Sequence, residues 1–352
     1  MVVGLIQNGF MGGHSDGIRI KFTAFGQNFS LDLKINRYLF AKSYVEKSLT
    51  REGQKLHRPP KYKENHCHYT GRVQGQVHSM VAVSTCDGIH GYIGMGDEAY
   101  HIEPAFDPEL PEFAHRLYRD SDMIHSQLRC GTHQHGHSIN INETRQILHT
   151  REVLHRMKRS LYEPYNSNPQ TRYVELFLVN DFRTFDKLGR DDRRLIQQSQ
   201  IIANIVSMLY QPLNIFIVLV GIENWTSGDK IIISNDADET LKNFLHYRKE
   251  RINPYHANDN AQLVSGTTFT NGVVGKAIKG TICTFQYSGG VNINLGTPMQ
   301  TAATVAHEMG HNFGMDHDNY TYCKCPQEKC IMAATSGGHK LEDQARNVYP
   351  PS

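Results

Sequence analysis

The chain has 352 residues, of which 39% are hydrophobic, so it is long enough to form two packed domains. Its net charge is only +2, because it has 37 basic and 35 acidic residues, and the two kinds are interleaved along the chain. No basic stripe indicates a nucleic acid or an anionic membrane as a partner, and no apolar run is long enough to predict a membrane-spanning segment. Seven cysteines and four Asn-x-Ser/Thr sequons favour an oxidising secretory environment; the sequons are Asn28, Asn142, Asn224 and Asn319.

The first part of the chain, residues 17–105, contains short stretches in which apolar and polar residues alternate. Such alternation is typical of strands with one buried face. It is clearest in residues 18–25, 29–35, 72–83 and 91–102. We therefore predict a small antiparallel β domain here. Residues 1–10 lack the basic region of a convincing signal peptide.

A basic cluster at Arg156, Lys158 and Arg159 precedes a Pro- and Asn-rich segment over residues 162–169. Arg-x-Lys-Arg is the pattern that proprotein convertases of the secretory pathway cleave. Cleavage after Arg159 would separate the first part of the chain from the second. The alternative is an ordinary exposed basic cluster, but its position between two domains favours processing.

The second part of the chain alternates between strand and helix patterns. Apolar runs over residues 173–179 and 213–220 are predicted strands, and between them apolar residues recur at helical spacing, at Leu195, Ile202, Ile205, Val206 and Leu209. This strand, helix, strand order predicts parallel strands in a sheet covered by helices. A second helix is predicted from Asp236 to Arg251, because it has an acidic first turn and ends before Asn253-Pro254.

Residues 307–317 contain a motif whose spacing predicts a catalytic zinc site. His307 and His311 are four residues apart, so both imidazoles project from one face of a helix, and Glu308 lies beside the first as a candidate general base. Gly314 permits a left-handed turn that returns His317 towards the metal as a third ligand. Three ligands leave the fourth zinc position open for water. A solvent-facing, His-rich helix is the alternative, but it does not account for five specified positions at fixed offsets.

The flanking residues agree with this interpretation. Thr297 and Pro298 form an N-cap and first-position proline pair, which predicts where the metal helix begins. Met332 follows Cys330 and Ile331 in a short apolar turn, 15 residues beyond His317. An isolated methionine is usually core filler, yet this one is similar to the Met-turn beneath the zinc of metzincins.

The chain resembles metalloproteases of the adamalysin, or ADAM, family, which are related to the snake-venom reprolysins. Asp318 after the third histidine and the Cys330-Ile331-Met332 turn favour that branch over matrix metalloproteases and astacins. Similarity to the family's catalytic domain extends to residues 173–176, 220–226 and 280–283, and similarity to its prodomain to residues 66–73 and 83–88.

The resemblance implies a domain organisation and a fold class. Residues 1–159 would be a β-rich prodomain. Residues 160–337 would be an α/β (α+β) metzincin-like zincin domain with a mixed, mostly parallel sheet, and residues 338–352 a divergent polar tail. A segment similar to Val291–Leu295 forms the antiparallel edge strand over the cleft in this family, where a peptide can add to the sheet. A surface hairpin is the alternative for this segment.

The resemblance also implies roles for individual cysteines. Cys130, in the segment 128–132, resembles the family's cysteine switch, in which a thiolate takes the open zinc position and displaces the catalytic water. A disulfide partner or a buried thiol are the alternatives for this residue. The expected disulfides are Cys67–Cys86 within the prodomain and Cys325–Cys330 beneath the active site. Cys283 and Cys323 are left over, because their family partners lie in a segment with no counterpart before Ser352.

These features predict a zinc endopeptidase zymogen of the secretory pathway, which cleaves extracellular proteins or the ectodomains of membrane proteins. A convertase would be its activating partner. The alternative is a truncated or latent family product that binds zinc or partners without cleaving them. A zinc-stabilised structural module is disfavoured, because structural sites usually fill all four positions and favour cysteine ligands.

Overall fold

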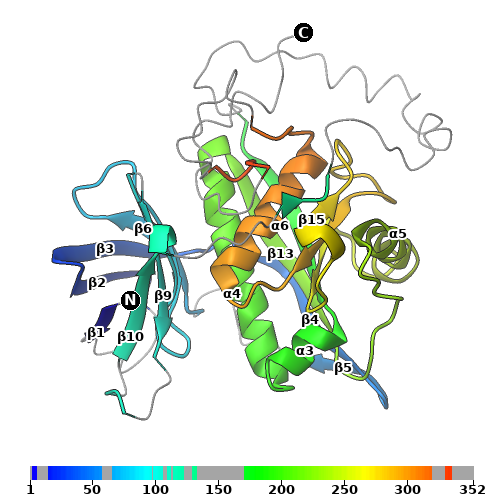
Figure 1. Ribbon diagram of the computed structural model, residues 1–352, viewed down its shortest axis with the longest axis horizontal. Helices are drawn as coiled ribbons and strands as arrows, with labels where there is room; N and C mark the ends of the chain where they lie inside the picture. Colours follow the sequence, from blue (N-terminus) through cyan, green and yellow to red (C-terminus); the bar gives the residue numbers. More distant parts are fainter. Residues whose placement is uncertain are drawn as a thin grey trace, which may run out of the picture.

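The computed structural model describes residues 2–5, 15–57, 66–96, 98–105, 109–111, 114–122, 129–132, 170–318 and 330–334. Within these ranges the backbone forms two eight-stranded sheets with helices packed against the second (Figure 1). Short 3-10 turns occur at Asp120–Asp122, Gln211–Leu213 and Thr270–Gly272. The mixed α/β class predicted from the sequence is confirmed.

The first sheet is antiparallel throughout and lies on the left of Figure 1. Alternate residues of its strands, among them Ile20, Leu31 and Ile93, form a separate apolar core. Its strands, in spatial order, are β1 (Val2–Leu5), β10 (Ala114–Arg119), β9 (Glu98–Pro104), β8 (His90–Met95), β7 (Met80–Ser84), β6 (His68–Val73), β3 (Gln27–Ile35) and β2 (Gly17–Ala24).

Two of the predicted strands in this sheet are in fact hairpins. Residues 72–83 are divided between β6 and β7 by a turn in which Gln76 N–H donates to Val73 O and Gly75 has a φ of +79°. Residues 91–102 are divided between β8 and β9 after Gly96, which has a φ of +55°. Each turn lies inside a stretch that was predicted as one strand, and each contains a glycine with a positive φ.

The second sheet is mostly parallel, as predicted. Antiparallel pairing occurs only between β15 and β16 and between β4 and β5 among its described strands. Its spatial order is β11 (Arg129–Cys130), β15 (Val273–Ala277), β16 (Gly289–Ile293), β14 (Asn260–Ser265), β12 (Arg172–Asn180), β13 (Ile215–Trp225), β4 (Phe40–Thr50) and β5 (Gly53–His57).

Helices α5 and α6 begin and end close to the predicted residues, and α4 includes the residues that recur at helical spacing. Asp191 caps α4 (Asp192–Tyr210), the crossover helix between the parallel strands β12 and β13. Asp236 caps α5 (Ala237–Tyr247), which continues into a π-helical turn at Arg248–Ile252. Thr297 caps α6 (Pro298–Phe313), the helix that carries the zinc motif. A short helix, α3 (Phe182–Lys187), was not foreseen.

The prediction that residues 291–295 form the edge strand is wrong. Residues 289–293 form β16, which lies between β14 and β15, and all five residues are buried. The antiparallel strand beyond it is β15, and β11 pairs with the outer side of β15. An interior strand needs two hydrogen-bonded neighbours, and a single segment of sequence does not specify how many it has.

The hairpin β4–β5 belongs to the second sheet, although the sequence predicts that residues 17–105 form a separate β domain. β4 pairs in parallel with β13, on the side away from the zinc motif (Figure 1). Lys47 lies opposite Glu223 in this register, and its Nζ is 2.7 Å from Glu223 Oε2. Both side chains are buried, so the seam contains a desolvated ion pair.

Helix α4 lies between the two sheets and is buried against both (Figure 1). Asn204 is 1% exposed; its Nδ2 donates to Tyr69 O at 3.1 Å, and its Oδ1 accepts from Asn36 at 2.9 Å. Apolar residues of both halves, including Tyr92 and Ile202, share one core cluster. The N-terminal half is therefore packed into the fold of the second half. No helix in the described ranges combines the length and apolar character needed to cross a bilayer.

Candidate active site

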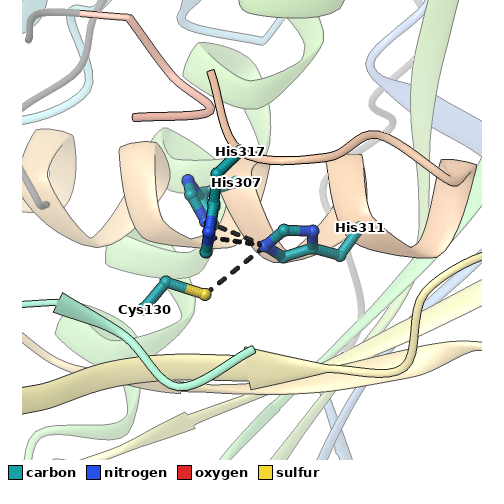
Figure 2. A group of neighbouring side chains, drawn as sticks. All are labelled: Cys130, His307, His311 and His317. Atoms are coloured by element: carbon teal, nitrogen blue, oxygen red, sulfur yellow. Dashed lines mark hydrogen bonds between the residues drawn. The ribbon is translucent and has the colours of Figure 1, made fainter. Parts of the chain in front are cut away.

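Helix α6 and the turn after it bring three imidazoles together (Figure 2). His307 and His311 project from one face of the helix, and their Nε2 atoms are 3.1 Å apart. Gly314, with a φ of +99°, ends the helix in the left-handed conformation and directs the chain back to His317. The Nε2 of His317 is 3.3 Å from that of His307 and 3.1 Å from that of His311. All three side chains are at least nine-tenths buried.

This cluster fits a zinc ion. Two nitrogens that are each 2.0–2.1 Å from a tetrahedral zinc are about 3.3 Å apart, which agrees with the observed separations. The Nδ1 atoms of His307 and His311 contact the carbonyl oxygens of Ile331 and Met315, an arrangement that leaves the Nε2 lone pairs to converge. Burial and the two neighbouring imidazoles lower the pKa of His311 well below its ordinary value, so it is present as the neutral form that binds metal.

Glu308 lies beside this cluster with its side chain fully buried. Burial, followed by the proximity of Cys130, raises the pKa of Glu308 well above its ordinary value. The carboxylate occupies space that exists because residue 275 is glycine. A β carbon on Gly275 would lie 2.5 Å from Glu308 Oε1 and 2.8 Å from its Cγ. No sequence motif indicates this role of Gly275, because strand β15 and helix α6 meet only in the folded chain.

The segment around Cys130 extends the sheet at the active site. β11 pairs in parallel with β15, and Gly131 N–H donates to Gly275 O at 2.9 Å. Cys130 carries a free thiol whose Sγ is 3.4 Å from His311 Nε2 (Figure 2). The same sulfur is 3.4 Å from Glu308 Oε1. The sulfur and the three histidine nitrogens all lie within 4.8 Å of one another, so the four groups could hold one metal ion.

The turn at residues 330–333 packs against helix α6, which carries the zinc motif. Met332 is 1% exposed and packs so closely on α6 that a β carbon at Gly310 would collide with its sulfur. Its carbonyl oxygen accepts a hydrogen bond from Asp318 N–H at 2.9 Å, next to His317. The contacts that the carbonyl oxygens of Ile331 and Met315 make with the histidine rings involve main-chain atoms, so no side-chain motif predicts them.

The remaining predicted residues are distributed over the rest of the chain. A disulfide joins Cys67 to Cys86, and Cys330 is also disulfide-bonded. The sequon residue Asn224 is fully buried and donates to Asp192, whereas Asn28 is exposed. Several predictions fall outside the described residues: Cys325, Arg156, Lys158, Arg159, both boundaries of residues 160–337, and the tail at 338–352.

Gly314→Ala tests the turn that delivers the third histidine. An L-residue is strained at a φ of +99°, and such a conformation costs about 1–3 kcal/mol. We expect the turn to relax, His317 to move away from the other two ligands, and zinc affinity to fall. Zinc titration against a chelating dye measures the change, and wild-type affinity in the variant would contradict the argument.

A buried helix that carries two histidines and a glutamate, followed by a left-handed turn to a third histidine, defines the class of zinc metalloproteases. Comparison with protein families agrees with the geometry. The model described as "Reprolysin (M12B) family zinc metalloprotease" matches residues 172–343, and that described as "Reprolysin family propeptide" matches residues 9–74. The chain belongs to the reprolysin family of zinc metalloproteases.

Sequence similarity to known proteins extends over both halves of the chain. Disintegrin and metalloproteinase domain-containing protein 9 of Homo sapiens is 33% identical over 93% of the chain and 39% of its own length. Protein 12 of this series from Mus musculus is 35% identical over 92% of the chain and 35% of its own length. The human protein 19 is 37% identical over 90% of the chain and 33% of its own length. The chain thus spans between a third and two fifths of the length of these curated relatives.

Proposed function

We propose that this chain is the latent form of a zinc endopeptidase, held inactive by its own N-terminal half. One observation carries the proposal. Cys130 Sγ lies 3.4 Å from both a candidate metal ligand and the candidate general base, at the end of a strand that pairs with the sheet edge. A thiol at this point competes with water for the metal, and the strand competes with a peptide for the edge.

His307, His311 and His317 would hold the metal. When bound, zinc supplies a Lewis acid that polarises a peptide carbonyl and makes a water molecule more acidic. The contacts of the His307 and His311 Nδ1 atoms with Ile331 O and Met315 O orient both rings before any metal arrives.

Glu308 would act as the general base. Its buried position raises its affinity for a proton, which suits a carboxylate that accepts a proton from the attacking water and later donates it to the leaving amine. Gly275 leaves room for this side chain next to the sheet edge. A peptide substrate would take the place of residues 129–132 along β15 in an extended conformation, since main-chain groups of that strand already bind a segment there.

Activation would require cleavage after Arg159 in the Arg156, Lys158, Arg159 cluster, by a proprotein convertase. This divides the chain into a prodomain at residues 1–159 and a catalytic domain at residues 160–337, followed by the tail at 338–352. Passage through the secretory pathway is supported by the Cys67–Cys86 disulfide, because such bonds form in oxidising compartments. Extracellular proteins or the ectodomains of membrane proteins are the substrates that this location offers.

Peptide hydrolysis before and after convertase treatment tests the proposal. We expect the uncleaved chain to be inactive, the cleaved chain to hydrolyse a mixed peptide library, and a zinc chelator to abolish turnover. Bound zinc without turnover in the cleaved, folded chain would favour the alternative, a latent product that binds metal or partners only. Turnover that persists in the presence of the chelator would refute the metal-dependent mechanism.

Cys130→Ala tests the role of the thiol separately from cleavage. The variant loses the fourth ligand but keeps the backbone hydrogen bonds between residues 129–132 and strand β15, including that of Gly131. We expect the uncleaved variant to hydrolyse small peptides measurably, at a rate below that of the cleaved wild type. Cys283 is the second free cysteine among the described residues, and Cys283→Ala provides the matched control, which should leave the uncleaved chain inactive. Equal inactivity of both variants would contradict the proposed switch.

A further inference from the structure

A buried cluster of amide side chains lies beneath the C-terminal end of the metal helix. Asn312, the residue after His311, is fully buried at its centre. Its Oδ1 accepts hydrogen bonds from Asn260 Nδ2 at 2.7 Å and from Gln262 Nε2 at 3.2 Å, both on strand β14. The side chain of Asn312 therefore connects the helix directly to the sheet.

The other end of the same amide binds the loop that follows strand β15 and the first residue of strand β16. Asn312 Nδ2 donates to Ile278 O and Thr281 Oγ1, each at 3.0 Å, and to Gly289 O at 3.1 Å. The side chain at position 312 thus faces two donor groups on strand β14 and three acceptor oxygens on the opposite side. It must therefore both accept and donate hydrogen bonds. Among side chains of this size only a carboxamide satisfies both requirements, because aspartate lacks the donors and leucine lacks both.

The loop bound by Asn312 completes the end of the helix. Gly280 N–H donates to His311 O at 2.8 Å, and Ile282 N–H donates to the backbone oxygen of Asn312 at 2.9 Å. Both carbonyl groups lie in the last turn of the helix, where intrahelical donors run out, and that of His311 also accepts from Gly314 N–H at 2.8 Å. The chain then turns at Gly314 and reaches His317 three residues later. Two of the three candidate ligands thus depend on a helix end whose position is set by Asn312.

We propose that Asn312 is a positioning residue of the metal site, which holds the His311 and His317 imidazoles at the separation that zinc requires. The inference rests on the metal assignment made above and not on peptidase activity. The amide of Asn312 orders the ligands before the metal binds. Without it, the helix end and the 278–282 loop separate, and the free energy of ordering the ligands is then lost from zinc binding.

Zinc affinity of the full, uncleaved chain provides the test. For Asn312→Asp we expect the zinc dissociation constant, measured by competition with a chelating dye, to rise about 10–100-fold, the usual effect of residues that orient metal ligands. Substitution of cobalt for zinc gives a second readout, since its visible absorption depends on coordination geometry. We expect the cobalt bands of the variant to differ from those of the wild-type chain.

Asn180→Asp is the matched control. Asn180 is also a buried amide, 1% exposed, but its Nδ2 donates to Ser199 and Asn224 and to no residue of α6. It should lower the unfolding temperature while leaving the zinc affinity and the cobalt spectrum unchanged. If both variants are destabilised and both keep wild-type zinc affinity, Asn312 is only a structural residue and the proposal fails.

Thr281→Val decides the case in which Asn312→Asp does not fold. This change preserves the size of the side chain and removes one acceptor of the Asn312 amide. We expect a smaller increase in the zinc dissociation constant in the same direction. A folded Thr281→Val variant with wild-type zinc affinity would overturn the inference. Since none of these measurements involves a peptide, an inactive wild-type chain would refute the proposed function and leave this result intact.

Discussion

Glu308→Gln is expected to lower peptide hydrolysis by the activated chain about 10²–10⁴-fold, the usual contribution of a general base. The substitution preserves the size of the buried side chain but removes its ability to take a proton from water. The three histidine nitrogens are untouched, so the zinc content should remain that of the wild-type chain. Turnover of a peptide library and elemental analysis of the same sample measure the two quantities.

Comparison of His307→Ala with Glu308→Gln distinguishes loss of the metal from loss of the general base. It removes one of three convergent nitrogens, and we expect it to lose zinc and activity together. Two results would contradict this division of roles. One is a Glu308→Gln variant that retains full turnover, and the other is a Glu308→Gln variant that is folded but free of zinc.

Lys47→Ala is expected to destabilise the uncleaved chain by about 3–5 kcal/mol, the usual cost of removing one partner of a buried ion pair. Glu223 is 1% exposed, and Lys47 supplies its only positive partner among the ion pairs of the described residues. Trp225 Nε1 and Tyr247 Oη also donate to Glu223, at 2.8 and 2.7 Å, but neither neutralises its charge. Denaturant unfolding of the uncleaved chain measures the loss.

Removing both charges gives the control for this prediction. The double variant Lys47→Met, Glu223→Gln leaves neither member of this pair as an unpaired charge, so it should recover most of the stability that Lys47→Ala loses. Arg190→Ala removes an exposed pair with Asp186 and should cost no more than about 0.5 kcal/mol. A Lys47→Ala variant as stable as Arg190→Ala would show that the seam between β4 and β13 does not support the fold.

The metal motif was predictable because its chemistry is local. His307, Glu308 and His311 lie on consecutive turns of one helix, and Gly314 determines how the helix ends. The starts of α5 and α6 were predictable for the same reason, since Asp236 and Thr297 cap the helices that follow them in the chain. The parallel pairing of β12 and β13 followed from the length of the crossover between them.

The edge of the sheet was not predictable. The alternating pattern of residues 291–295 indicates a strand, but an edge strand and an interior strand can share one pattern. The hairpin β4–β5 was misassigned for a similar reason, because its pairing with β13 joins residues far apart in the sequence. The two hairpin turns in the first sheet were missed, although Gly75 and Gly96 lie at them with positive φ angles.

By itself the sequence determined the class of metal site and the helix that bears it, because both depend on residues within a few turns of one another. It also indicated the parallel pairing of β12 and β13, because a helical crossover separates the two strands. Only the tertiary structure decided that Gly275 makes room for Glu308, that Asn312 joins the metal helix to the sheet, and that residues 40–57 extend that sheet. These features are contacts between segments that are distant in the sequence. They stabilise the fold only after the loops between those segments have closed, and a local sequence pattern does not specify which loops close.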